Sequence, residues 1–247
     1  MKISRYISIE DRRLSTLERR FRREIYKAIL LQVKYYLKNG FLGDHLYSTL
    51  TELYRPVLDF YLKQQLDILN KDNLQKQNEF FVDSWGEWIN DYLLRTIRER
   101  AFMIDGVTDG LIKKVFASAQ RGEVVGSITD MVMAHFDGSI GRRRARTIAR
   151  TEVGEAVNIA KTHSSDIWEQ QTGMKQGKLW IHRGAKVPRD WHMALDNGIP
   201  IPKEQPWIVT DPNTGITDEM MYPHDHRASS ENVINCGCMV IYTRLQN

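Results

Sequence analysis

The stretch Arg144-Ala145-Arg146-Thr147-Ile148-Ala149-Arg150-Thr151-Glu152 decides how the rest of the sequence is organised. Apolar and small side chains recur in it at helical spacing, and the pattern continues as far as Gln171. We therefore predict one long central helix over residues 142–171, ended by Gly173, because glycine readily adopts the left-handed conformation that closes a helix. Its predicted apolar stripe consists of Ala145, Ile148, Ala156, Ile159 and Ile167, with Glu152 and His163 on the same face.

The sequence before this helix also has helical periodicity. Apolar residues recur at intervals of three or four over residues 14–37, 44–69 and 80–102, which predicts three amphipathic helices with an aromatic-rich core stripe in the last. Asn39-Gly40 supplies a stop after the first helix. Pro56 predicts a kink or a break in the second, because proline lacks the backbone donor and clashes with the preceding turn.

Two short helices are predicted between these and the central helix. Thr108-Asp109 can cap one that runs to Gln120, and Ser127-Ile128-Thr129-Asp130 resembles a capping box for another that runs to Phe136. Gly122 and Gly126 would join the two short helices. Gly138 and Gly141 would bracket the turn before the central helix.

After Gly173 the helical pattern disappears, and turn-forming residues become frequent. Residues 178–182, 207–209 and 233–242 are predicted strands, and residues 211–215 a turn. Residues 199–202 cannot form a central strand, because their prolines lack the ladder donor. The fold class is therefore α+β, with a long-helix N-terminal half, a central long helix and a small turn-rich α+β C-terminal module. We expect a helical docking region over residues 1–105 and a second domain over residues 106–247.

Basic side chains are concentrated in two places. Residues 1–38 contain eleven Lys and Arg against four acids, although the whole chain has a formal net charge of only +4. Local basic faces attract polyanions, so packaged DNA is one candidate partner and an acidic protein surface is the alternative. The residues expected to face such a partner are Arg19, Arg20, Arg22, Arg23, Arg142, Arg143 and Arg144.

Composition also limits the compartment. No apolar run reaches the ~18 residues of a membrane helix, and no apolar segment follows the charged first residues, so we expect neither a membrane span nor a secretory signal. The two cysteines are one residue apart, which is not a disulfide framework. We expect synthesis in a reducing cytoplasm.

Two cysteines and several histidines could bind a metal ion. Cys236 and Cys238 would project from the same face of an extended strand, and with His192 and His226 they would make a tetrahedral Cys₂His₂ set for one structural zinc. The alternative is simple burial of both cysteines as small apolar residues. A second alternative is a metal-dependent nuclease, for which the candidates are His182, Asp190, His192, Asp225 and His226.

The order of motifs over residues 109–242 resembles the Mu F-like family of phage head-morphogenesis proteins. The shared elements are Gly122-x-x-x-Gly126-Ser127, Arg144-Ala145-x-x-Ile148-Ala149-Arg150-Thr151-Glu152, Ala156, Asn158, Lys178, Trp180, Arg189-Asp190-x-His192, Leu195-Asp196 and Asn235-Cys236-Gly237-Cys238. Two segments depart from the family pattern. Ala185-Lys186-Val187-Pro188-Arg189 replaces Asp-x-Arg-x-Arg, and Pro223-His224-Asp225-His226 replaces Pro-Gly-Asp-Pro.

The resemblance implies a structural minor virion protein without catalytic activity, located in the phage head near the portal. It also implies roles in head assembly, in genome packaging or retention, or in DNA delivery, with the portal and other head or neck proteins as partners. Glu152 is expected to anchor the C-terminal module, because a carboxylate on a core-facing stripe is costly to bury without hydrogen bonds. The shared residues Arg150, Trp180 and Asn235 are expected to anchor it as well.

Overall fold

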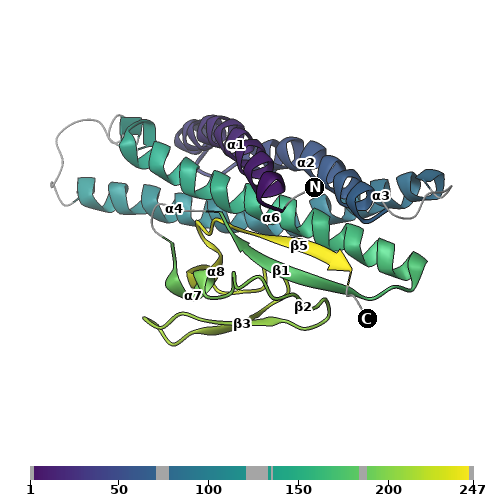
Figure 1. Cartoon of the computed structure of the whole chain (residues 1–247). Coiled ribbons are helices and arrows are strands. Elements are labelled where there is room, and N and C mark those ends of the chain that lie inside the picture. The colour runs from purple at the N-terminus through teal and green to yellow at the C-terminus, as the bar shows by residue number, and fades with distance from the viewer. Residues whose placement is uncertain (1–2, 71–77, 121–132, 135, 184–187, 245–247) are drawn as a thin grey trace. The chain divides into compact units, whose positions relative to one another are not determined.

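A computed structural model describes residues 3–70, 78–120, 133–134, 136–183 and 188–244 (Figure 1). The chain forms two compact units, each built from separate stretches. Unit 1 comprises residues 1–17, 56–83 and 150–247, and unit 2 comprises residues 18–55 and 84–149. The division into residues 1–105 and 106–247 stays a prediction. None of the described helices is both long and apolar enough to cross a membrane.

Unit 2 is helical in its described part. It contains most of α1 (Ile3–Asn39), the start of α2 (His45–Asn70), the end of α3 (Asn78–Tyr92), the π-helical turn η1 (Leu93–Ile97), α4 (Arg98–Gln120) and the start of α6 (Ser139–Thr172). Its core is the apolar stripe that the periodicity predicted, with Phe21, Ile25 and Val33 fully buried in α1 and Ile97 in η1. The expected stop after α1 is confirmed, since Gly40 has a φ of 81°.

Two helix boundaries differ from the prediction. Helix α2 is unbroken through Pro56, so a break there is wrong. The proline is exposed, and the apolar pairs on both sides of it, Leu53-Tyr54 and Val57-Leu58, are buried. Their burial offsets the ~3 kcal/mol that an interior proline costs.

Thr108 does not cap a new helix. It lies inside α4, where its hydroxyl donates to the Ile104 carbonyl across 3.0 Å, so the side chain is satisfied without interrupting the helix. The predicted helix from Ser127, with Gly122 and Gly126, lies outside the described residues for most of its length. Phe136, at its expected end, is fully buried. Gly141 lies within the first turn of α6 and not before it.

Helix α6 confirms the predicted central helix and ends where expected, at Gly173 with a φ of 67°. Its buried surface is wider than a stripe, because residues 151–158 are all buried. Ile148, Ile159 and Ile167 are only partly buried. The closely packed residues are instead mostly small, namely Ala149, Val153, Ala156, Val157 and Ala160.

Unit 1 contains two small antiparallel sheets. The strand order of one is β2 (Ile201–Pro202), β1 (Gln176–His182) and β5 (Cys238–Arg244), and the other pairs β3 (Trp207–Thr210) with β4 (Thr217–Met220). The segment with Pro202 is therefore a short edge strand and not a central one, which agrees with the prediction. Figure 1 shows β1 and β5 running alongside α6. The first turns of α1 also belong to unit 1, where Asp11 pairs with Arg183 across 3.1 Å and Glu10 accepts from Gln64.

Candidate functional site

His192, Cys236 and Cys238 converge in the core of unit 1. His192 lies in the short helix α7 (Asp190–Met193), and its Nδ1 is 3.4 Å from the Cys236 sulfur and 3.9 Å from the Cys238 sulfur. The three ligand atoms lie within 4.8 Å of one another. Zinc bond lengths in a tetrahedral site place nitrogen and sulfur ligands about 3.6 Å apart. This cluster could therefore hold a metal ion.

The two cysteines converge for a reason that differs from the predicted one. Residues 233–242 are not one strand, because Val233 ends helix α8 (Ser230–Val233) and β5 begins only at Cys238. Asn235 turns the chain with a φ of 58°, and the Cys238 amide then donates to the Cys236 sulfur across 3.4 Å. A tight turn, and not the alternation of a pleated strand, brings the thiols together.

Asn232 in α8 fixes the orientation and tautomer of His192. Its amide nitrogen donates to the Val209 carbonyl and to Asp218, which leaves its Oδ1 as an acceptor for Trp191 Nε1 at 2.9 Å and His192 Nε2 at 3.3 Å. Because Nε2 must then carry the hydrogen, Nδ1 presents its lone pair to the two sulfurs. Outer contacts of this kind accompany metal-binding histidines. Asn232 could not be selected from the sequence, since it matches no spacing rule.

Burial and hydrogen bonding give the two thiols different acidities. The pKa of Cys236 is lowered well below its usual value, mainly because the Cys238 thiol donates to it, with His224 adding to the effect. The same hydrogen bond, together with burial, raises the pKa of Cys238. Both cysteines are buried in the apolar core with Trp180, as the simple-burial alternative also expects. The convergence of two thiols on the Nδ1 lone pair of His192 goes beyond simple burial, because these are donors that a metal ion can bind once the thiols lose their protons.

His226 does not belong to this cluster, which corrects the predicted ligand set. Its Nδ1 contacts Glu155 Oε1 across 3.1 Å and the Tyr222 hydroxyl across 3.3 Å. Glu155 is fully buried in α6, and His226 supplies one of the contacts that offset the cost of burying its carboxylate. The neighbouring His224 is itself 1% exposed and lies close to Cys236.

Comparisons with family models, with curated proteins and with solved structures find no match to this chain. The resemblance to the Mu F-like family therefore depends on the shared motif residues alone, and their places in the structure can be compared with the roles expected for them.

The predicted anchor residues occupy different environments. Glu152 is 3% exposed in α6, and Trp180 is 1% exposed with its ring edge-on to His192 at 5.3 Å. Asn235 is exposed, but its backbone amide donates to Thr151 Oγ1 in α6 across 2.9 Å. Its contribution is therefore the turn itself, because asparagine tolerates the left-handed conformation. Arg150 is half-buried, and its Nε has no hydrogen-bond partner among the residues that the structure describes.

Asn158 fastens the sheet to α6, a role that the sequence analysis did not assign. Its side-chain amide donates to the Pro223 carbonyl at 2.8 Å and to the Cys238 carbonyl at 3.4 Å, and it accepts from the Val240 amide at 2.9 Å. One buried side chain thus satisfies three main-chain groups on two segments. A polar residue on the inner face of a helix is the signal that could have indicated this role.

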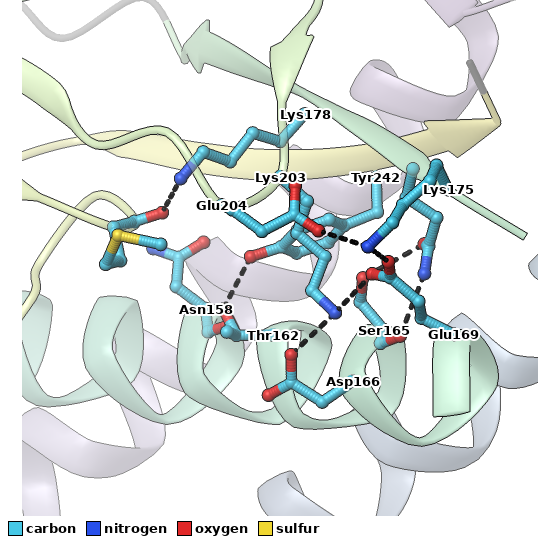
Figure 2. A network of polar contacts seen from close by, with 12 residues as sticks. Asn158, Thr162, Ser165, Asp166, Glu169, Lys175, Lys178, Lys203, Glu204 and Tyr242 are labelled. Atoms are coloured by element: carbon cyan, nitrogen blue, oxygen red, sulfur yellow. Dashed lines mark hydrogen bonds and ion pairs between the residues drawn. The ribbon is translucent and has the colours of Figure 1, made fainter. Parts of the chain in front are cut away.

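A second polar network holds the other end of the sheet to the last turns of α6 (Figure 2). Thr162 contacts the Tyr242 hydroxyl at 2.8 Å, and Lys203 pairs with both Asp166 and Glu169. Figure 2 shows Lys175 between Glu169 and Glu204, which it contacts at 2.6 and 2.9 Å. The sheet is therefore positioned on α6 by side-chain hydrogen bonds at both ends.

The basic residues of unit 2 divide into two groups. A hollow of about 580 Å³ between α1 and α6, the arginine groove, is lined by Arg19, Arg22, Arg23, Tyr26, Arg142, Arg143 and Arg146. Arg23 within it also pairs with Glu24 across 2.6 Å. Arg20 is exposed outside the groove. Arg144 is turned inward and donates to the Ile104 carbonyl across 2.8 Å, so its predicted outward role is wrong.

Two of the residues considered for a nuclease are held by contacts outside the cluster. Asp225 is bound by Arg227 and by the Met221 amide, and His226 is bound by Glu155. The backbone amide of His182 donates to Asp196. Within the described ranges, His192, Cys236 and Cys238 are the one group of three metal-ligating side chains close enough to share an ion.

Proposed function

We propose that this protein is a structural minor head protein of a tailed phage, of the Mu F-like type, that acts near the portal. The observation that carries the proposal is the meeting of the family-like residues in one buried framework. Within unit 1, Asn158 donates to the Cys238 carbonyl, and His192 contacts both the Cys236 sulfur and the Trp180 ring. The turn at Asn235 is held to α6 by its hydrogen bond to Thr151. In this proposal their shared task is to fasten a turn-rich module to a helix.

The burial of this framework favours a structural role over catalysis. His192, Cys236 and Cys238 are 1–3% exposed. A catalytic metal site needs a coordination position that substrate or water can reach, whereas structural sites are closed. We therefore propose that the protein is not an enzyme, and the nuclease stays the alternative. That alternative requires metal-stimulated DNA cleavage that disappears in a His192→Ala variant.

We further propose that the cluster holds one structural zinc ion. The residues fit this ion because two thiols and an imidazole nitrogen, already oriented by Asn232, are the donors that zinc prefers. Bound zinc would supply a cross-link among α7, the Asn235 turn and β5. Such a link stabilises small modules that have little regular structure.

The arginine groove supports contact with packaged DNA, with an acidic surface of the portal or another head or neck protein as the competing partner. Six arginines around one hollow form a strongly positive surface that can neutralise several phosphates. We expect duplex DNA to bind weakly, with an affinity that falls steeply as salt rises. The double variant Arg22→Gln, Arg142→Gln should lower the slope of log affinity against log salt by about 2.

The matched control for the groove is Arg20→Gln, Lys34→Gln, which removes the same charge from exposed positions outside it. This control should retain most of the binding. An equal loss in both double variants would indicate diffuse charge and no groove. Absence of binding at low salt would favour the protein partner.

The proposal as a whole is tested by locating the protein in infected cells. Virions purified on a density gradient should contain it at a few copies per particle, measured by quantitative mass spectrometry. Cross-linking should join it to the portal before any other virion protein. Its absence from virions, with all of the protein in the soluble fraction, would refute the proposal.

A further inference from the structure

His224 is a buried group next to the cluster whose role the contacts described so far do not explain. It is 1% exposed, and its Nδ1 atom is buried without a hydrogen-bond partner in the described part of the chain. Leaving such an atom unsatisfied costs about 1–3 kcal/mol. Native structures rarely keep this cost unless a ligand, a water or an ion relieves it.

The backbone at His224 is also held in a costly conformation. Its φ is 67°, in the left-handed region, which costs a residue with a Cβ roughly 1–2 kcal/mol. Glycine, which has no Cβ atom, adopts this conformation without that cost. A histidine in this conformation therefore indicates a use for the ring that outweighs the strain.

A glycine in α6 makes room for this ring. A Cβ atom added at Gly154 would lie 2.3 Å from His224 Nε2, much closer than any real contact. Glycine inside a helix costs about 1 kcal/mol relative to alanine. The chain thus has two costly features, the left-handed histidine and the helical glycine, and both serve to place one imidazole ring.

From this placement we infer that His224 is the fourth ligand of the ion at His192, Cys236 and Cys238, binding through Nδ1. The inference depends on the proposed zinc, and it replaces His226, whose ring is bound to Glu155. His224 adjoins the Cys236 side of the cluster. It lies outside the three atoms that are mutually within 4.8 Å, so binding an ion has to draw the ring closer.

The fourth ligand has a consequence for function. With two sulfurs and two imidazole nitrogens, all four positions of a tetrahedral zinc come from the protein. No position is then left for a water or a substrate, so the site can cross-link but cannot catalyse hydrolysis. The ion would join α7, the loop before α8 and the start of β5.

Metal binding by matched variants of the full chain tests this inference. Wild-type protein, His224→Gln and His226→Gln are compared for zinc content by elemental analysis and for zinc affinity by competition with a chromogenic chelator. We expect about one zinc per chain in the wild type, as structural sites of this type hold. His224→Gln should weaken affinity by more than about 100-fold, beyond the range for outer contacts. His226→Gln should change it by less than about 10-fold.

Cobalt substitution gives a readout of the ligand set itself. The wild type and His226→Gln should show the intense visible bands of four-coordinate Co²⁺ with thiolate charge transfer. His224→Gln should keep the charge transfer and lose band intensity, because water replaces the imidazole. If His224→Gln does not fold, His224→Gly, which relieves the backbone strain, is measured in its place.

The outcomes separate the two proposals. No zinc in the wild type, and none taken up, overturns the metal proposal and this inference together. Zinc bound equally well by the wild type and by the His224 variants overturns the inference and leaves the three-ligand site in place. Loss of zinc in His226→Gln alone would restore the ligand set predicted from the sequence.

Discussion

Units 1 and 2 bury very different amounts of polar surface. Among the described residues, sixteen polar or charged side chains are buried in unit 1 and three in unit 2. Unit 2 is held together by apolar stripes on helices, which tolerate exchange of similar side chains. Unit 1 depends on hydrogen bonds with defined partners, and each one broken leaves a buried group unsatisfied. Unit 1 should therefore respond more sharply to single changes.

Removal of the proposed ion should have the largest effect, and it should destabilise unit 1 while leaving the stability of unit 2 nearly unchanged. A strong chelator added to the full chain should increase amide exchange in β1, β5 and the Asn235 turn by on the order of 100-fold or more, because binding energy at such sites is also folding energy. Exchange within residues 18–55 and 84–112 should change little. Hydrogen-exchange mass spectrometry measures both regions in one sample, and equal loss of protection in both units would contradict the comparison.

Replacement of one buried amide in each unit should have an intermediate effect. Asn158→Ala in unit 1 should cost about 3 kcal/mol in free energy of unfolding, because the Val240 amide and the Pro223 carbonyl lose a buried partner. Gln32→Ala in unit 2 should cost about 1 kcal/mol. Gln32 is equally buried, but its partners, the side chains of Asp105 and His45 and the Gly43 carbonyl, belong to partly buried residues that water can reach.

Urea denaturation of both variants, followed by circular dichroism, gives the two free energies. A cost for Gln32→Ala that equals or exceeds the cost for Asn158→Ala would show that the two units depend on buried polar contacts to the same degree.

The smallest effect is expected at Asp105 in unit 2. Burial raises the pKa of this carboxyl from 3.8 to about 6, against an opposing hydrogen bond from Gln32. Because the folded-state pKa is raised, the contribution to stability is fully present below pH 3.8 and is lost as pH rises through about 6. Asp105→Asn should therefore stabilise the protein at pH 7 by about 1 kcal/mol after allowance for solvent screening.

Unfolding of the wild type and Asp105→Asn at pH 4 and pH 7 checks this sign. The two proteins should have nearly the same stability at pH 4 and differ at pH 7. A variant that is less stable at pH 7 would mean that attraction between Asp105 and Arg144 outweighs burial of the charge.

Helical periodicity predicted the fold well because the pattern depends on many residues, so a few exceptions do not change it. The α+β class, the extent of α6 and the stops at Gly40 and Gly173 are confirmed. The errors occur where a single residue determines the local structure. Thr108 satisfies its own hydroxyl inside a helix, and Asn235 turns the chain before Cys236. Neither outcome follows from the spacing of apolar residues.

The candidate site was predicted only in part for a similar reason. Cys236, Cys238 and His192 could be selected by residue type, and the structure brings them together. The choice between His224 and His226 could not be made from type, because two histidines two residues apart have the same chemistry. Partners distant in the sequence distinguish them, since Gly154 makes room for one ring and Glu155 binds the other.

Unit 1 combines the first turns of α1 with everything after residue 149. The same unit also includes residues 56–83, so during synthesis Glu10 can meet Gln64 of α2 early. The ribosome must then add more than a hundred further residues before Arg183 can pair with Asp11, which takes roughly ten seconds or more at typical elongation rates. Removal of a few N-terminal turns should therefore impair a module that is encoded at the opposite end of the gene.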